Sequence, residues 1–489
     1  MDAAAVIGCF RDRSILITGS TGFLGKMLVE KILRVQPDVR KLYLLVRAPD
    51  AASAEHRVLT EVVATKLFDV LRSKHGADFN SFIKNKISPL PGDITKETCA
   101  LRNSMVEQIS EDIHVIVSVA ATTSFYERYD VALASNTLGV AHVCDLAKKC
   151  ANLKMLLHVS TAGEQEGLLL EKPFDVGKAL KKDYNLDIQS EIKLVESVKS
   201  KLRIQFSNDK IEKRKMKELG LKRARHFGWP NVYSLTKAMG EMLLGTLGRD
   251  LPSVIVRPSI ISSTFQEPMP GWTEGTRTMD MLYVAYNDQK LPCFIADRTV
   301  IVDVIPGDMV INALMVAMAI HWDTHGTQAI YHVTTGHRNP LLFSTFLESG
   351  YEYFRSNPRV TKDGRIVKDR RVKFFKTYTF FRLYMILRYN LALETLHVMS
   401  VFGHSLSQHY NKLKRGYNFL ILVAKLYAPY AFFKGCFDDT NMRNLWAITS
   451  TDQLKDGSMF DCDPACIDWG SYLINTHIPA ALTYARNNN

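Results

Sequence analysis

The residues best suited to chemistry in this sequence are a tyrosine and a lysine, Tyr233 and Lys237, which stand four positions apart. On a helix this spacing places both side chains on one face. A lysine ammonium beside a phenol favours the phenolate and lowers a pKa that is ordinarily about 10. The tyrosine can then exchange a proton with a reacting oxygen near neutral pH. The pair therefore predicts acid–base chemistry at a carbonyl or alcohol oxygen.

Two hydroxyl side chains, Ser160 and Thr161, end a predicted strand over 155–160. A hydroxyl at a strand end and a tyrosine on the next core helix can converge on one carbonyl oxygen, where the hydroxyl stabilises developing negative charge. Because the Tyr-Lys spacing occurs by chance in many helices, its support comes from these hydroxyls and from a glycine-rich turn in the same chain. We take Tyr233, Lys237, Thr161 and Ser160 as the candidate catalytic residues.

The glycine-rich turn stands near the start of the chain. Residues 14–18 form an apolar run that predicts a buried strand, and Gly19, Gly22 and Gly25 follow it. The next run is amphipathic, with apolar positions at Leu24, Met27, Leu28 and Ile32. Strand, glycine turn and helix in this order are the context of a dinucleotide-binding fingerprint, in which the helix N-terminus faces the pyrophosphate. The spacing alone also fits a glycine-rich turn without a ligand.

A second predicted strand, over 41–46, is followed by Arg47. NAD-specific proteins usually carry an acidic residue at this position for the ribose 2′-hydroxyl, whereas an arginine suits the 2′-phosphate of NADP(H). We therefore predict NADP(H), with a solvated strand-end cation as the alternative.

Later strand ends supply further candidate cofactor contacts. Gly92-Asp93-Ile94 follows a predicted strand, and a carboxylate with the next amide can contact an adenine ring, although a plain turn fits equally well. Small residues after another strand leave room for a ribose and nicotinamide. The predicted cofactor-binding residues are Thr18, Gly19, Thr21, Gly22, Phe23, Leu24, Gly25, Arg47, Asp93, Ile94, Ala120, Ala121, Asn136, Tyr233, Lys237 and Pro258.

Strands alternate with helical patterns through the first two thirds of the chain, which predicts an α/β fold with a doubly wound parallel sheet. A Lys- and Glu-rich stretch over about 175–227 is expected to be a helical insertion whose charges form a solvated face. Near residue 346 the alternation stops. We therefore predict a reductase-type dinucleotide-binding domain over 1–345 and a smaller, mostly helical domain over 346–489. The aromatic and basic mixture of that second domain fits either a membrane surface or its own core.

Composition and charge restrict the class of molecule that the protein is expected to bind. The 489 residues carry a formal net charge of +12, which favours an anionic partner such as a phosphorylated ligand, coenzyme A or anionic lipid. No nucleic-acid motif is found, and the eight scattered cysteines are expected to be reduced and structural. No metal-ligand spacing, signal or transit peptide, or apolar run of membrane-spanning length is recognised.

The combined motifs resemble the extended short-chain dehydrogenase/reductase superfamily. More narrowly, the chain resembles the alcohol-forming fatty acyl-CoA reductases, in particular their plant branch. The phrases that carry this resemblance are KLYLLVR at 41–47, WPNVYSLTKAMGE at 229–241, VRPSII at 256–261, PMPGW at 268–272, FDDTN at 437–441, and IDW at 467–469 with NTHIP at 475–479. They extend over nearly the whole chain.

The resemblance implies a four-electron reduction of a long-chain or very-long-chain acyl-CoA. One NADPH would convert the thioester to a hemithioacetal that collapses to aldehyde and free CoA, and a second would give the primary alcohol. Tyr233 would be the general acid, Lys237 would tune it and hold the nicotinamide ribose, and Thr161 or Ser160 would bind the oxyanion. Because substrate and product are lipids, the cytosolic face of the endoplasmic reticulum or the cytoplasm is the expected location.

One departure from the family pattern follows Thr161. Ala162 runs directly into Gly163-Glu-Gln-Glu-Gly167, a loop shortened by about three residues, and a misplacement of ~1 Å can cost a hundredfold in rate. A catalytically impaired NADPH-binding homologue is therefore one alternative. A nucleotide-sugar epimerase or dehydratase is another, which the long helical C-terminal part disfavours.

Overall fold

The computed structural model describes residues 2–162, 167–205, 208–276, 279–322, 328–359, 364–367, 371–402, 404–450 and 459–487. Its contacts divide the chain into two compact units, each built from segments that are distant in sequence. Unit 1 comprises residues 1–274, 303–339 and 435–467, and unit 2 comprises residues 275–302, 340–434 and 468–489.

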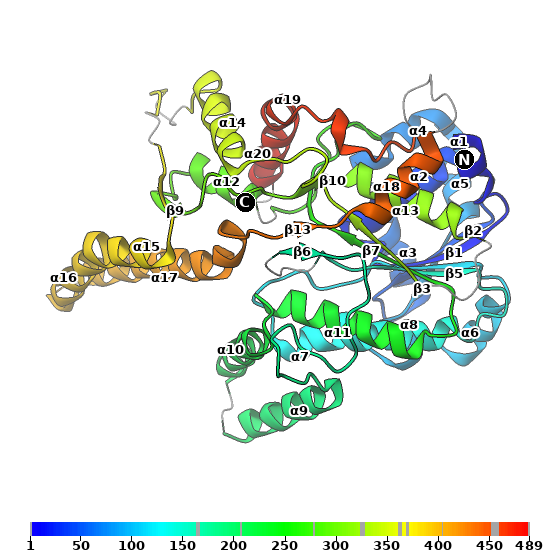
Figure 1. Ribbon diagram of the computed structural model, residues 1–489, viewed down its shortest axis with the longest axis horizontal. Helices are drawn as coiled ribbons and strands as arrows, with labels where there is room; N and C mark the ends of the chain where they lie inside the picture. The colour runs from blue at the N-terminus through cyan, green and yellow to red at the C-terminus, as the bar shows by residue number, and fades with distance from the viewer. Residues whose placement is uncertain are drawn as a thin grey trace. The chain divides into compact units, whose positions relative to one another are not determined.

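The centre of unit 1 is a seven-stranded parallel sheet, as predicted (Figure 1). Its spatial order is β11-β7-β5-β4-β1-β2-β3. The strands are β1 (Ser14–Thr18), β2 (Lys41–Val46), β3 (Ile87–Pro91), β4 (Val115–Ser118), β5 (Met155–Val159), β7 (Ser253–Pro258) and β11 (Ala329–Val333). The sequence pattern predicts strands over 14–18, 41–46, 87–91, 114–119, 155–160 and 254–256, and the first six strands confirm them. Strand β11 extends the sheet beyond the predicted strands.

All these strands are parallel, but the direction in which successive strands are added to the sheet reverses between β1 and β4. Strands β2 and β3 continue on one side of β1, and β4 and β5 lie on the other. Thr18 pairs in register with Leu45 on one side and Ser118 on the other, so these strands end at the same edge. Ligands of doubly wound sheets bind at such a switch point.

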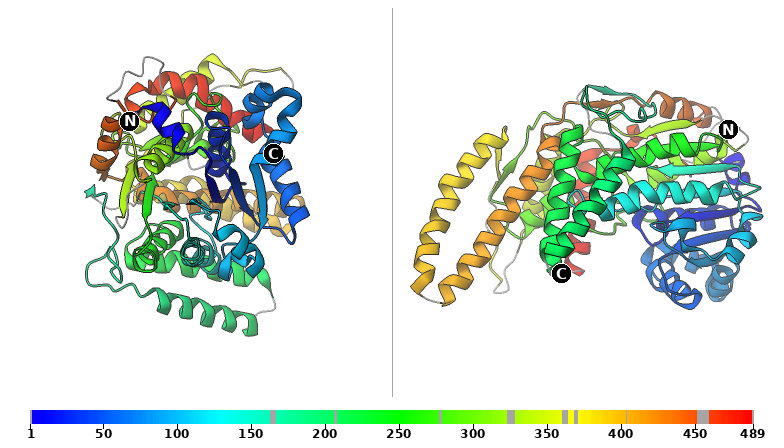
Figure 2. Two further views of the ribbon diagram at one scale, coloured as in Figure 1. Left: turned by 90° about the vertical axis from the view of Figure 1, so that its right-hand side faces the viewer. Right: turned by 90° about the horizontal axis from the view of Figure 1, so that it is seen from below.

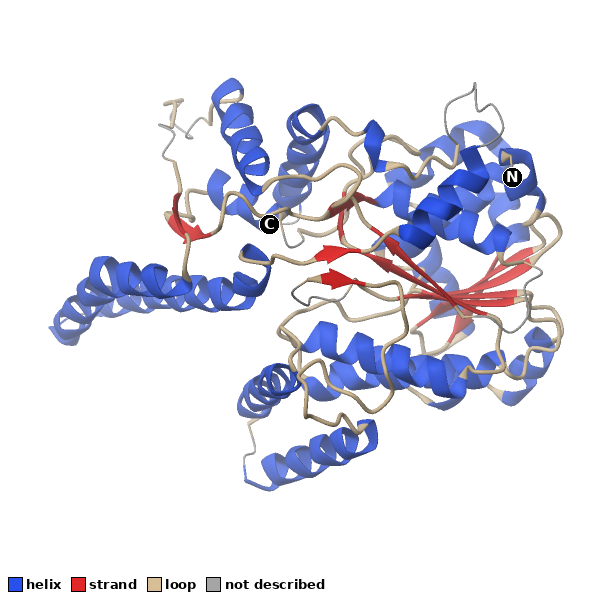
Figure 3. Cartoon of the chain, viewed as in Figure 1, coloured by secondary structure: helices blue, strands red, loops and turns tan. Residues whose placement is uncertain are grey.

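Helices cover both faces of this sheet, as Figures 1 and 3 show. On one face lie α2 (Phe23–Val35) and α13 (Gly307–Ile320), and on the other lie α8 (Gly139–Ala147) and α11 (Val232–Leu247). The other helices of unit 1 are α1 (Ala3–Gly8), α3 (Ala51–Arg57), α4 (Asp69–His75), α5 (Phe79–Lys86), α6 (Asn103–Ser110), α7 (Tyr129–Ala132), α9 (Ile188–Gln205), α10 (Asp209–Phe227) and α18 (Thr440–Ser450). A π-helical turn, η5 (Leu133–Leu138), precedes α8.

The predicted insertion is helical, but the prediction that its charges form a solvated face is wrong for two of its carboxylates, Glu191 and Glu212. Helix α9 buries the carboxylate of Glu191, which accepts hydrogen bonds from the Tyr129 hydroxyl and the Arg223 guanidinium. Glu212 of α10 pairs with Arg128. These carboxylates attach the insertion to the rest of unit 1, because a buried charge requires such partners.

Unit 2 is mostly helical, as expected of the C-terminal part. It contains α12 (Asp280–Asn287), α14 (Phe343–Ser356), α15 (Tyr378–Met385), α16 (Leu391–Met399), α17 (His404–Ala431), α19 (Trp469–Tyr472) and α20 (Ile478–Asn487), with β9 (Cys293–Ile295) paired to β12 (Lys373–Phe375). Within the described part of the chain, no helix combines the length and apolar character needed to cross a bilayer.

The predicted boundary at residue 345 needs correction. Residues 435–467 pack with unit 1, where β13 (Cys436–Phe437) pairs with β6 (Leu168–Leu169), and residues 275–302 pack with unit 2. The sequence showed where the strand–helix alternation stops. It did not show that the chain returns to the first unit.

Candidate cofactor and active site

The glycine turn connects β1 to α2 with two close backbone approaches. Gly19 has φ +72°, and a Cβ there would lie 2.7 Å from the backbone N and Cα of Ala120. A Cβ on Gly25 would lie 2.3 Å from the carbonyl oxygen of Gly19. Only glycine fits these two positions. Because they lack side chains, the N-terminus of α2 can lie directly beside the end of β4. The backbone therefore has the tight strand-to-helix turn that the sequence predicted, and phosphate binding at the N-terminus of α2 stays a prediction.

The Ala120-Ala121 segment is held against this turn by side chains. The hydroxyl oxygen of Thr18 accepts hydrogen bonds from the amides of Val119 and Ala120, both at 3.2 Å. Asn136, on η5, accepts from the Thr122 amide at 2.9 Å and donates to the Thr122 carbonyl at 3.0 Å. Its amide group is thus engaged within the protein. Asn136 thus fixes the Thr122 backbone, and its predicted contact with the cofactor stays a prediction.

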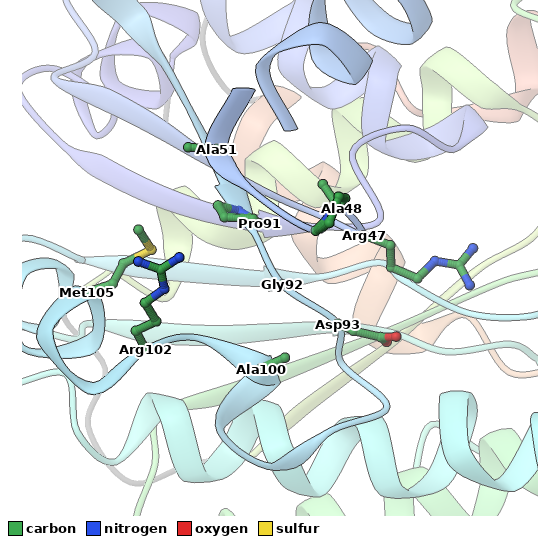
Figure 4. Close-up of a pocket in the computed structure, with 10 residues that line it drawn as sticks. Arg47, Ala48, Ala51, Pro91, Gly92, Asp93, Ala100, Arg102 and Met105 are labelled. Carbon is green, nitrogen blue, oxygen red and sulfur yellow. The ribbon is translucent and has the colours of Figure 1, made fainter. Parts of the chain in front are cut away.

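A pocket of about 370 Å³ lies where the loops after β2 and β3 meet (Figure 4). It is lined by Arg47, Ala48, Pro49, Ala51, Pro91, Gly92, Asp93, Ala100, Arg102 and Met105. Arg47 and Asp93 are among the residues predicted to bind the cofactor, and Arg102 is not. The only signal for Arg102 in the sequence was a cation shortly after the Gly-Asp turn, and only the fold brings it into the same pocket as Arg47.

Asp93 and Ile94 are fixed by local bonds. The Asp93 carboxylate accepts from the Thr95 amide at 2.9 Å, and the carbonyl of Ile94 is 2.7 Å from Nδ1 of His142. Their loop is therefore held in place at the floor of the pocket.

Helix α11 carries the tyrosine and lysine. Asn231 caps its start by accepting from the Ser234 amide at 2.9 Å, and the helix packs against η5 and α8. Tyr233 is half-buried, and its ring is stacked near Phe125 with centroids 6.2 Å apart. Lys237 is 1% exposed, one turn further along.

The Lys237 ammonium has two partners from β5. It donates to the Val159 carbonyl at 2.7 Å and lies 3.3 Å from Nε2 of His158, whose Nδ1 is 3.3 Å from the hydroxyl oxygen of Ser118. Burial lowers the pKa of Lys237 to about 8, against the opposing effect of the Glu241 carboxylate. Burial and the nearby Lys237 charge hold the pKa of His158 well below its usual range, so the imidazole is neutral and can accept from the ammonium.

His158 was not among the predicted residues. The signal for it was a histidine within an otherwise apolar strand, two residues before Ser160.

The predicted hydroxyls follow directly on β5. The Ser160 amide donates to the Val256 carbonyl at 2.7 Å, and the Ala162 amide donates to the Pro258 carbonyl at 3.1 Å. Pro258, predicted as a cofactor contact, thus anchors the segment through its backbone. The Ser160 hydroxyl is buried and has no hydrogen-bond partner among the described residues, which is unusual for a buried polar group. The shortened loop at 163–166 lies outside the described residues.

A buried ion pair fixes α11 to the sheet. Arg257 of β7 donates to the carboxylate of Glu241, with Nη2 2.6 Å from Oε2, and to the carbonyl of Lys172 at 2.9 Å. Its Nη1 lies 3.1 Å from Nε2 of His332. In the sequence Arg257 stands out only within the phrase VRPSII, because its three partners Glu241, Lys172 and His332 come from three separate segments.

Comparisons with known proteins agree with this architecture. Two family profiles, both described as "Male sterility protein", match residues 17–314, the NAD-binding part, and residues 393–488. "Fatty acyl-CoA reductase 1" of Arabidopsis thaliana is 44% identical over 97% of both chains, and the "Alcohol-forming fatty acyl-CoA reductase" of Simmondsia chinensis is 42% identical over 99% of this chain and 100% of its own. The chain belongs to the fatty acyl-CoA reductase family.

Solved structures support the fold of this fatty acyl-CoA reductase family member. The terminal R domain of the myxalamid PKS-NRPS pathway aligns over 100% of this chain and 96% of its own, with a TM-score of 0.56 and 17% identity. The reductase domain of a nonribosomal peptide synthetase from Mycobacterium tuberculosis aligns over 99% and 96%, with a TM-score of 0.57 and 16% identity.

Proposed function

We propose that this protein reduces long-chain or very-long-chain fatty acyl-CoA to a primary fatty alcohol and free CoA, through an aldehyde and with two NADPH. The observation that carries the proposal is the arrangement at the end of β5. There the buried Lys237 ammonium is fixed beside the strand that presents Ser160 and Thr161, one helical turn from Tyr233.

The glycine turn between β1 and α2 and the pocket lined by Arg47 and Arg102 fit NADPH. When bound, NADPH supplies the hydride for each reduction. In the first reduction Tyr233 gives its phenolic proton to the thioester oxygen, while the Ser160 or Thr161 hydroxyl donates a hydrogen bond to the same oxygen. The product is a hemithioacetal. Its C–S bond then breaks, the hydroxyl proton passes to the departing sulfur, and the aldehyde and the CoA thiol are formed.

In the second reduction Tyr233, reprotonated from solvent, gives a proton to the aldehyde oxygen and the alcohol forms. The Lys237 cation favours the phenolate left behind in both steps. Each reduction therefore consumes one hydride and one proton.

The choice of NADPH rests on Arg47 and Arg102. Replacing either with alanine removes a charge-assisted contact to the 2′-phosphate, so we expect the KM for NADPH to rise about tenfold and the KM for NADH to stay unchanged. Arg11→Ala, at an exposed arginine outside the pocket, is the control. Equal changes for both cofactors would show that the arginines do not read the phosphate.

We propose that the protein acts at the membrane surface of the endoplasmic reticulum that faces the cytosol, with the cytoplasm as the alternative location. Supporting this are the lipid character of the proposed substrate and product and the net charge of +12.

The deciding experiment incubates purified protein with NADPH and acyl-CoAs of increasing chain length, and follows thiol release, NADPH oxidation and lipid products together. We expect alcohol with two NADPH oxidised per thiol, and loss of both reductions in Tyr233→Phe. Should NADPH bind while no thiol is released at any chain length, the protein would be an impaired cofactor-binding homologue.

A further inference from the structure

Among the described residues, a helical hairpin in unit 2, defined here as residues 378–431, carries many of the exposed apolar side chains. Its first arm comprises α15, the π-helical turn η6 (Ile386–Asn390) and α16, and its second arm is α17. The two arms lie side by side in the yellow and orange segments of Figures 1 and 2. Phe381, Met385 and Leu393 are buried on the inner face of the first arm.

The outer face of the first arm is also apolar. Phe380, Leu383, Leu387 and Leu391 follow at intervals of three or four residues, and all are exposed. Of the 21 large hydrophobic side chains exposed among the described residues, ten lie in this hairpin, although it contains only 54 residues. Val398 is 66% exposed and Val401 is 80% exposed. A helix that is apolar on two faces needs a second apolar partner, because contiguous exposed patches of this kind mark interaction sites.

The charge of the hairpin restricts what that partner can be. It carries six Lys and Arg residues and a single acidic residue, Glu394. Lys414 of the second arm donates to that carboxylate at 2.9 Å, so its negative charge is already compensated within the hairpin. Lys412 and Arg415 stand exposed beside the exposed Leu413.

We propose that this hairpin is the element that attaches the protein to an anionic bilayer, with its outer apolar side chains inserted among the acyl chains and its cations at the headgroups. The inference rests on the proposed membrane-surface location and names the element responsible. A second copy of the chain would cover the apolar face but bring two positively charged surfaces together. An anionic lipid surface satisfies both the apolar side chains and the cations.

The test measures cosedimentation of the full-length protein with phosphatidylcholine vesicles, with and without phosphatidylserine. We expect stronger binding to the anionic vesicles. The double variant Phe380→Ser, Leu387→Ser should bind more weakly to both kinds of vesicle. Each of the two substitutions should contribute a loss of about tenfold or more in affinity. Lys412→Gln with Arg415→Gln should weaken binding about thirtyfold, and only to the anionic vesicles.

Matched controls come from the helical insertion of unit 1. Ile204 of α9 is 86% exposed, and α10 is rich in lysine, so Ile204→Ser and the pair Lys213→Gln, Lys222→Gln remove similar groups from another surface. These should bind vesicles like the wild type. NADPH binding by every variant checks that unit 1 is intact, and far-UV circular dichroism checks the helical content of unit 2.

Failure of the wild type to bind either vesicle would overturn the location as well as the hairpin proposal. Binding that survives the hairpin substitutions but falls in the α10 pair would overturn the hairpin proposal alone. Sedimentation velocity without lipid tests the alternative that a second copy of the chain covers the outer apolar face. If the wild type is a dimer and the double variant Phe380→Ser, Leu387→Ser is a monomer, the partner of this face is a second copy and not a bilayer.

Discussion

At the scale of single residues, the proposed mechanism requires Lys237 to stay charged in a buried position. The ammonium has a carbonyl and a neutral imidazole as partners, and its pKa is lowered to about 8 by burial. Lysine is protonated below its pKa. We therefore expect kcat/KM for acyl-CoA reduction to fall as the pH rises through about 8, because the cation that favours the Tyr233 phenolate is then lost.

His158 should determine the pH at which kcat/KM falls, because it accepts a hydrogen bond from the charged form of Lys237. His158→Leu removes an acceptor from the charged form of Lys237, which lowers the lysine pKa further and moves the alkaline limb about one pH unit lower. His158→Gln can still accept through its amide oxygen and should leave the limb near that of the wild type. The pH profile of kcat/KM, with NADPH affinity as the control, decides this. Superimposable profiles for the leucine variant and the wild type would refute the role of His158.

Residues whose placement depends on local sequence were predicted, and residues whose placement depends on contacts between distant segments were missed. Tyr233 and Lys237 belong to one helix and the glycines to one turn, so their spacing in sequence already fixes their geometry. The neighbours of His158 and Arg102 in the candidate site come from other segments. Nothing in the local sequence specifies that the side chain of His158 meets Lys237, or that Arg102 lies across a pocket from Arg47. The same limit applies to Asn136, whose contact with Thr122 spans fourteen positions.

At the scale of elements, the approach of α11 to η5 is the contact that places the Tyr-Lys helix. A Cβ on Gly240 would lie 2.2 Å from the carbonyl oxygen of Asn136, whereas a Cβ on Gly245 of the same helix would meet nothing within 4 Å. The two glycines therefore form a matched pair.

Gly240→Ala should destabilise the protein by about 1–3 kcal/mol, because α11 and η5 must separate. It should also weaken NADPH binding through the Asn136–Thr122 contact. Gly245→Ala should stabilise the protein by up to about 1 kcal/mol, since alanine is the better helix former. Urea unfolding and NADPH titration measure both effects. Equal stability of the two variants would mean that the helices adjust without cost.

At the scale of the whole molecule, unit 1 is completed by a segment that follows most of unit 2 in sequence. The carboxylate of Glu171 accepts from the amides of His332 and Asn441, and Arg338 pairs with Asp463. Asn441 also donates to the carbonyl of Ile330 on the edge strand β11, at 2.9 Å. Residues 435–467 therefore supply partners for one carboxylate oxygen of Glu171 and for the buried Ile330 carbonyl, and a chain ending at 345 would lose both.

A fragment of residues 1–345 should consequently fold poorly, although it contains the glycine turn, both pocket arginines and the Tyr-Lys pair. The loss of partners for Glu171 and Ile330 leaves buried groups unsatisfied, at about 1–3 kcal/mol each. Joining residues 435–467 to residues 1–339 through a flexible linker should restore a cooperative thermal transition and NADPH binding. Circular dichroism melting of the two forms tests this. A fragment 1–345 that melts as cooperatively as the linked form, and binds NADPH equally well, would show that the returning segment is dispensable to unit 1.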